Sequence, residues 1–94
     1  MRIEYAREAR EDLDQAIDRI QRENPAAAIH LADRLFSVIE RLAVGDYAGA
    51  EVTLATGEMV RSWSVPPYRV YYRRDSDRLL VVRVYHQARR PLAT

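Results

Sequence analysis

The sequence predicts a single α+β domain: a short N-terminal strand, a helical hairpin, and then a three-stranded antiparallel meander. Three observations lead to this prediction. Polar and apolar residues alternate at the start, apolar residues then recur every three or four positions to residue 42, and Val, Tyr and Trp alternate with polar residues from residue 59. Because 94 residues is the length of one domain with a thin core, we expect residues 1–94 to form one unit.

The first half of the chain predicts one strand and two helices. Arg2–Tyr5 alternates polar and apolar residues, as a short strand does. A first amphipathic helix is indicated by apolar residues spaced three and four positions apart, namely Ala6, Ala9, Leu13, Ala16, Ile17 and Ile20. Asn24 is a favourable N-cap and Pro25 a favourable first residue for a second helix, which ends near Gly45. Its apolar face carries Ala28, Leu31, Ala32, Leu35, Ile39 and Leu42.

The second half predicts a loop followed by β structure. Residues 44–57 contain glycines and mixed small residues, and we expect a loop there. The three strands of the meander are predicted at Met59–Val65, Tyr68–Arg74 and Leu79–His86. The links at Pro66-Pro67 and at Asp75–Asp77 are short, so neighbouring strands must run antiparallel.

Alternation assigns the side chains of the meander to two faces. In the second of these strands, Tyr68, Val70 and Tyr72 share one face, and Arg69, Tyr71 and Arg73 share the other. In the third, the corresponding sets are Leu80, Val82 and Val84, and Val81, Arg83 and Tyr85. We expect the apolar set to pack on the helical hairpin, whose own apolar side must be covered. The opposite face would then present arginine and tyrosine together.

Charge is distributed unevenly along a chain whose formal net charge is only +1. Residues 1–58 hold seven Arg and twelve Asp or Glu, a net charge of −5, whereas residues 59–94 hold eight Arg and two Asp, a net charge of +6. This asymmetry indicates an electrostatic binding surface on the second part, or a partner of opposite charge. The acids of the first helix, among them Glu11, Asp12 and Asp14, are expected on a solvated face.

Composition excludes several classes of function. The chain has no cysteine, so it holds no disulfide and no zinc site built on sulfur. It shows no metal-ligand spacing and no Gly-rich phosphate loop, and we expect neither a cofactor nor a metal. Its apolar stretches are too short to span a membrane, and its start lacks the pattern of a signal peptide. We therefore expect a cytoplasmic protein without a membrane partner.

The open sheet face offers the first candidate site. Arginine with interleaved tyrosine suits single-stranded RNA, since Arg binds phosphates and aromatic rings stack on bases. Two alternatives remain open: the Arg stems cover the rim of an exposed sheet, or an acidic peptide lies along it. His86, at a strand end, is either a general acid–base or a histidine held by hydrogen bonds. Trp63, near Arg61, is either a stacking residue or a rim tryptophan.

Three segments of the C-terminal part carry a resemblance to a known family. They read Val-Arg-Ser-Trp-Ser-Val at 60–65, Pro-Tyr-Arg-Val-Tyr-Tyr at 67–72 and Val-Arg-Val-Tyr-His-Gln-Ala-Arg at 82–89. In this order they resemble the RelE/ParE superfamily of bacterial toxins. Ile3–Tyr5 and the helix break at Asn24-Pro25 fit the same pattern, so the resemblance covers almost the whole chain.

The resemblance implies a toxin that is encoded with an antitoxin, and it implies one of two activities. RelE-like members cleave mRNA in the ribosome without a metal, whereas ParE-like members poison DNA gyrase. In the ribonuclease branch, the positions that bind phosphate or transfer protons correspond here to Arg61, Arg69, His86 and Arg89. These four would be the catalytic residues of an endoribonuclease; a gyrase inhibitor would have none.

Two features favour the ParE-like branch. The C-terminal tyrosine expected of the nucleases is missing, because Gln87 follows His86 and the chain ends Pro-Leu-Ala-Thr. In addition, a net charge of +1 is low for binding ribosomal RNA, which is driven by neutralising phosphates. We therefore expect inhibition of DNA gyrase by protein–protein binding, with ribosome-dependent mRNA cleavage as the alternative.

Two surfaces are predicted for these partners. The surface for the target consists of Arg61, Trp63, Arg69, Tyr71, Arg73, Arg83, Tyr85, Arg89 and Arg90. A ParD-like antitoxin is expected to form a hetero-oligomer with the toxin and to place a helix over the seam of the helical hairpin. The residues predicted for that contact are Leu13, Ile17, Ile20, Leu31 and Leu35.

Overall fold

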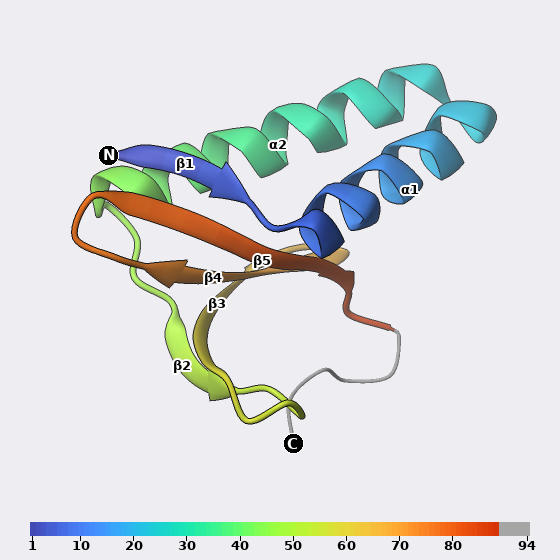
Figure 1. Cartoon of the computed structure of the whole chain (residues 1–94). Helices are drawn as coiled ribbons and strands as arrows, with labels where there is room; N and C mark the ends of the chain where they lie inside the picture. Colours follow the sequence, from blue (N-terminus) through green and yellow to red (C-terminus); the bar gives the residue numbers. More distant parts are fainter. Residues whose placement is uncertain (89–94) are drawn as a thin grey trace.

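Figure 1 shows a computed structural model in which two helices cover one face of a five-stranded sheet. The structure describes residues 1–88. The elements follow in the order β1 (Arg2–Tyr5), α1 (Arg7–Glu23), α2 (Pro25–Val44), β2 (Ala50–Thr53), β3 (Met59–Val65), β4 (Tyr68–Arg74) and β5 (Arg78–His86). The predicted α+β class, with its initial strand, helical hairpin and final meander, is confirmed.

The strands lie in the order β1-β5-β4-β3-β2. β2 to β5 are joined by short turns and pair antiparallel, whereas β1 pairs parallel with β5. A parallel pair requires a long crossover connection, and the helical hairpin begins that crossover. The first and last strands of the chain therefore lie side by side, as Figure 1 shows.

Local sequence signals set the ends of the two helices. Asn24 ends α1 and caps α2, where the backbone N–H of Ala27 donates to its side-chain oxygen over 3.1 Å. Gly45 closes α2 in the left-handed conformation, with φ of 88°. Arg74 of β4 donates to two carbonyls in the last turn of α2, those of Leu42 and Ala43. These carbonyls lack helical partners, so the contact also anchors the helix on the sheet.

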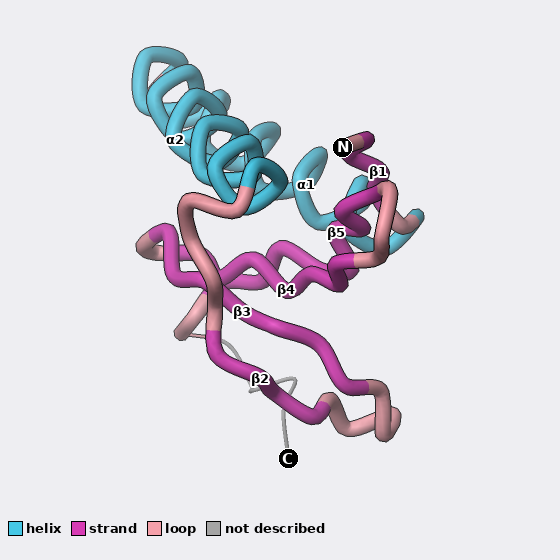
Figure 2. Tube along the Cα trace, turned by 90° about the vertical axis from the view of Figure 1, so that its left-hand side faces the viewer, coloured by secondary structure: helices cyan, strands magenta, loops and turns pink. Residues whose placement is uncertain are grey.

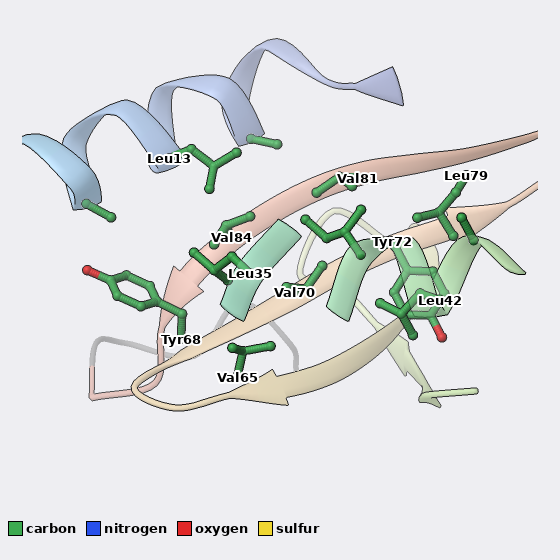
Figure 3. Packing of buried hydrophobic residues seen from close by; sticks show 14 of the residues in the cluster. Leu13, Leu35, Leu42, Val65, Tyr68, Val70, Tyr72, Leu79, Val81 and Val84 are labelled. Atoms are coloured by element: carbon green, nitrogen blue, oxygen red, sulfur yellow. The ribbon is translucent and has the colours of Figure 1, made fainter. Parts of the chain in front are cut away.

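The main core lies between the hairpin and the sheet (Figure 3). Its helix side is the predicted apolar face of the hairpin, with Leu13, Leu35 and Leu42 among its buried members. Its sheet side comes from β3, β4 and β5. The buried sheet residues are Val65, Tyr68, Val70, Tyr72, Leu79, Val81 and Val84.

A β-bulge changes the predicted faces of β5. The register between β4 and β5 shifts between Tyr71, which pairs with Arg83, and Tyr72, which pairs with Val81. The extra residue reverses the alternation, so Val81 joins Val84 in the helix-facing core and Val82 points to the other face. The prediction that Leu80, Val82 and Val84 share one face was therefore wrong for this strand.

The segment 44–57, predicted as a loop, contains the edge strand β2. With β3 it forms a hairpin that bends away from the helices (Figure 2). The hairpin builds a second apolar cluster on the face of the sheet opposite the helices, which we call the concave face. Its buried members are Leu54, Val60, Tyr71 and Val82, with Val52, Leu80 and Tyr85 partly buried beside them.

Within the described residues, no helix is long and apolar enough to cross a membrane.

The structure predicts that removing the Tyr72 hydroxyl lowers the stability of the protein more than removing the hydroxyl of its neighbour Tyr71. The buried backbone N–H of Gly49 donates to the Tyr72 hydroxyl over 2.7 Å, which attaches the segment before β2 to β4. Tyr72→Phe leaves this donor unsatisfied, and we expect it to lower the free energy of unfolding by about 1–3 kcal/mol in urea denaturation. The Tyr71 hydroxyl makes no hydrogen bond within the described residues, so Tyr71→Phe is the control. Equal losses for both variants would contradict this role.

Candidate functional site

The predicted binding residues are divided between the two faces of the sheet. On β3, Arg61 lies opposite Tyr72 and Trp63 opposite Val70, so both side chains point to the helix side. Trp63 packs against the main core and is stacked under Tyr47, with ring centroids 4.7 Å apart and planes 2° apart. Trp63 is therefore a rim tryptophan, in line with the second of the two interpretations of the sequence.

The concave face carries the other candidates. Arg69, Tyr71 and Arg73 of β4 alternate with the core residues of that strand, and Arg83 and Tyr85 of β5 lie opposite Tyr71 and Arg69. The Arg83 guanidinium lies 5.2 Å from the centre of the Tyr85 ring. A pocket of about 360 Å³ lies between the β2–β3 turn, β5 and the first turn of α1. Its lining comprises Glu8, Leu54, Ala55, Thr56, Glu58, Val82 and Arg83.

Most arginines of the sheet already bind a carboxylate of the same chain. In four of these pairs the acid comes from residues 1–58 and the arginine from residues 59–88. The pairs and distances are Arg78–Glu4 at 2.8 Å, Arg83–Asp12 at 2.7 Å, Arg61–Glu51 at 3.4 Å and Arg73–Glu58 at 2.5 Å. Part of the charge asymmetry is therefore satisfied between the two parts of one molecule.

The least exposed of these contacts is made by Asp12 of α1. Its carboxylate accepts hydrogen bonds from both the Nε and Nη2 atoms of Arg83, at 2.7 and 3.0 Å, and from the backbone N–H of Val84 at 3.0 Å. The hydrogen bonds to Asp12 raise the pKa of Arg83 above its usual value. The expectation that Asp12 lies on a solvated face was wrong, since its side chain is 12% exposed.

Arg69 differs from the other arginines of the concave face. Its Nη1 atom donates to the Ser62 hydroxyl over 3.0 Å, and within residues 1–88 it has no carboxylate partner. Arg69 is half-buried, and its cross-strand neighbours are Ser64 of β3 and Tyr85 of β5. A guanidinium has five N–H donors, so most of those on Arg69 remain available to a ligand.

His86 lies on the helix side of the sheet, opposite Tyr68, whose ring it meets edge to face at 5.2 Å. Its Nδ1 atom accepts a hydrogen bond from the backbone N–H of Ala88 at 3.0 Å. The pocket beside it, partly lined by Asp12 of α1, measures about 20 Å³, enough for about one water molecule. This geometry is that of a strand-end histidine ordered by hydrogen bonds.

Three of the four residues of the ribonuclease hypothesis, Arg61, Arg69 and His86, are therefore not assembled around one point. Arg61 of β3 and His86 of β5 lie on the helix side, but they pair with opposite ends of β4. Their partners, Tyr72 and Tyr68, are about 13 Å apart along an extended strand. Arg69 points to the opposite face. Arg89, and with it the predicted binding residue Arg90, lies outside the described residues.

Most of the residues predicted for the antitoxin contact are buried in the main core. Leu13, Leu31 and Leu35 are at most 7% exposed because they pack between the hairpin and the sheet, so they are not available on the surface. Ile17 and Ile20 are partly exposed. The structure instead exposes two residues of α2 that the sequence analysis missed, Ile29 at 62% and Phe36 at 41%. Their seven-residue spacing places them on one side of the helix, and this spacing was the available signal.

No group of three or more His, Asp or Glu side chains that could hold a metal ion occurs among residues 1–88.

The helical hairpin on one face of a five-stranded sheet places the chain among small α+β proteins. Comparison with known families is more specific. The family model described as "ParE toxin of type II toxin-antitoxin system, parDE" matches residues 3–91, and the chain belongs to this family. The resemblance inferred from the sequence is thereby confirmed.

Solved structures agree on the fold. A chain of the "Chromosomal ParDE TA system from P. aeruginosa" is similar with a TM-score of 0.70 and 20% sequence identity. The match covers 92% of this chain and 95% of that chain. No curated protein matches the sequence.

The structure predicts that the ion pair of Asp12 with Arg83 contributes more to stability than the exposed ion pair of Glu51 with Arg61. Asp12→Asn removes a largely buried carboxylate that accepts three hydrogen bonds, and we expect it to lower the free energy of unfolding by about 1–3 kcal/mol. Glu51→Gln removes the longer, exposed pair with Arg61 and should cost less than about 1 kcal/mol. Chemical denaturation of both variants gives the comparison, and a loss at Glu51 as large as that at Asp12 would contradict it.

Proposed function

We propose that this toxin inhibits DNA gyrase by protein–protein binding and is neutralised by a ParD-like antitoxin, with which it forms a hetero-oligomer in the cytoplasm. The observation that carries the proposal is the separation of Arg61, Arg69 and His86. General acid–base cleavage requires a proton-transfer group within hydrogen-bond reach of the reacting phosphate. A phosphate held by Arg69 on the concave face cannot reach His86 on the helix side.

Electrostatics support the same choice. Binding to ribosomal RNA gains its free energy from arginines and lysines that neutralise phosphates. Here Arg61, Arg73 and Arg83 already bind carboxylates, so each offers less charge to RNA. A protein target of mixed charge does not depend on a strongly basic surface, because shape and apolar contacts contribute to its affinity.

The surface proposed for the antitoxin helix is the outer side of the helical hairpin. Ile29 and Phe36 are exposed there, and large apolar side chains on one side of a helix are typical of a helix-binding surface. Ile17 and Ile20 of α1, which are partly exposed, are kept from the original set. Leu13, Leu31 and Leu35 support this surface from the core.

The target can be identified by testing the purified toxin on two reactions. We expect stoichiometric toxin to inhibit DNA supercoiling by gyrase and to leave mRNA intact in a translating ribosome reaction. His86→Ala should keep supercoiling inhibition within about threefold, because no proton transfer is involved. A ribonuclease that used His86 would lose about 10²–10⁴-fold in cleavage rate. Intact supercoiling together with toxin-dependent cuts in the message would refute the proposal.

The antitoxin surface can be tested on α2. Phe36→Asp introduces a charge at the centre of the proposed apolar contact, and we expect antitoxin affinity to fall at least tenfold in calorimetric titration. Val44→Asp is the control, because Val44 is also exposed, at 70%, but lies at the last residue of α2. Similar losses for the two variants would show that the contact is not centred on Phe36.

A further inference from the structure

The sheet divides where β3 begins and β4 ends. The pairing of these two strands starts only at Arg61 and Tyr72. The first two residues of β3 pair with β2, and the last two residues of β4 pair with β5. The two hairpins therefore separate at this end, as Figure 2 shows, and a pocket of about 150 Å³ lies in the fork between them. One water molecule takes up about 30 Å³, so this fork pocket has room for the end of a side chain.

The fork pocket carries an uncompensated positive charge. Its lining includes Arg61, Arg73 and Arg74, but only one acid, Glu51. Glu51 pairs with Arg61 over 3.4 Å, and Arg73 pairs with Glu58. Arg74 donates to two carbonyl oxygens in the last turn of α2 and, within residues 1–88, binds no carboxylate. Three guanidinium groups are thus compensated by two carboxylates, and the pocket favours an anion.

Large apolar side chains surround the fork pocket on the helix side of the sheet. Met59 lines the pocket and is 60% exposed, because the β2–β3 hairpin bends away from the helices (Figure 2). It alternates with Arg61 and Trp63 on one side of β3, and the ring of the exposed Tyr47 stacks on Trp63. Arginine among Tyr, Trp and Met is the composition of the energetically dominant part of a protein–protein interface.

We call these five residues, Tyr47, Met59, Arg61, Trp63 and Arg74, the fork surface. Its composition favours a protein carboxylate over the phosphates of a nucleic acid. A nucleic acid brings a row of negative charges, and its binding depends on several arginines or lysines that neutralise them. Here one positive charge is left over, and the exposed carboxylate of Glu51 at the same pocket repels a polyanion. A single Asp or Glu fits this balance, since a guanidinium binds a carboxylate through two parallel hydrogen bonds.

We propose that the fork surface contacts the target of the toxin, with an Asp or Glu of the target in the fork pocket and apolar target side chains on Met59 and Tyr47. This rests on gyrase being the target, as proposed above, and it adds the place of the contact and the chemistry of the gyrase segment, which is acidic with apolar neighbours. The fork surface shares no residue with the surface proposed for the antitoxin helix.

The fork pocket is tested by adding a negative charge at its exposed wall. Met59→Glu places a carboxylate beside the arginines, where it takes the place of the target's acid. We expect the toxin concentration for half-inhibition of supercoiling by gyrase to rise at least about tenfold. Ala26→Glu adds the same charge at an exposed position in the first turn of α2, and its inhibition should stay within about threefold. Full inhibition by the Met59 variant would overturn the proposal.

The arginines are tested by direct binding to purified gyrase in calorimetric titration without DNA. Arg61→Gln removes one guanidinium of the fork pocket, and we expect affinity to fall about 10- to 100-fold. Arg2→Gln removes the same charge from the exposed strand β1, and the loss should stay below about threefold. Equal losses would indicate a general charge effect and contradict the proposal. Thermal melting checks that both variants remain folded.

Titration of the toxin with duplex DNA alone distinguishes a carboxylate from a phosphate as the ligand. We expect Arg61→Gln to leave the affinity for DNA within about threefold, because one excess charge contributes little to binding a polyanion. A loss of DNA affinity as large as the loss of gyrase affinity would make the ligand a phosphate and refute the proposal.

Antitoxin binding and wild-type inhibition separate the remaining outcomes. Met59→Glu should keep its affinity for the purified cognate antitoxin; a loss equal to that for gyrase would assign the fork surface to the antitoxin instead. If the wild-type toxin neither binds nor inhibits gyrase, the proposed function is wrong and the fork contact fails with it. If the wild-type toxin inhibits gyrase and both fork variants inhibit equally well, the fork contact alone is wrong.

Discussion

The contact of Asp12 with β5 holds the two layers of the molecule together. β1 ends at Tyr5, opposite Val81, and β5 continues to His86 without a strand on that side. Asp12 takes the place of the missing strand, because its carboxylate accepts the backbone N–H of Val84 and the guanidinium of Arg83. One side chain thereby satisfies a strand edge that would otherwise be open to pairing with another chain, and it fixes α1 over the core.

The same contact belongs to a wider pattern of charge. The first part of the chain supplies acids and the second part supplies arginines, and the fold brings them into pairs around the sheet. Exposed pairs of this kind contribute little stability each. Their larger effect is on recognition, because an arginine bound to a neighbouring acid is no longer free for phosphate. The fold therefore reduces the basic character that the sequence of residues 59–94 suggests.

The helical hairpin, the meander strands and the helix-facing core could be predicted from the sequence, because periods of 3.6 and 2 residues report directly on burial. β2 could not, since a four-residue edge strand of Ala, Glu, Val and Thr is too short to show a period. The bulge at Val82 was also invisible: Val81 and Val82 are equally apolar, and the pairing with β4 alone decides which one faces the helices. The role of Asp12 could not be predicted either, because its sequence neighbours are those of an ordinary solvated helix acid and its partners on β5 are about 70 residues away.

Arg69 illustrates how binding of an anion differs from cleavage in what it requires of a site. Family resemblance links it to a phosphate-binding arginine, and phosphate and carboxylate both accept the paired hydrogen bonds of a guanidinium. Cleavage of RNA needs a proton-transfer group close to that arginine, and His86 is turned to the opposite face. Within residues 1–88, the Arg69 guanidinium donates to the Ser62 hydroxyl on the concave face and has no carboxylate partner. Such a surface can still bind a protein segment, because binding requires complementarity of charge and shape but no proton transfer.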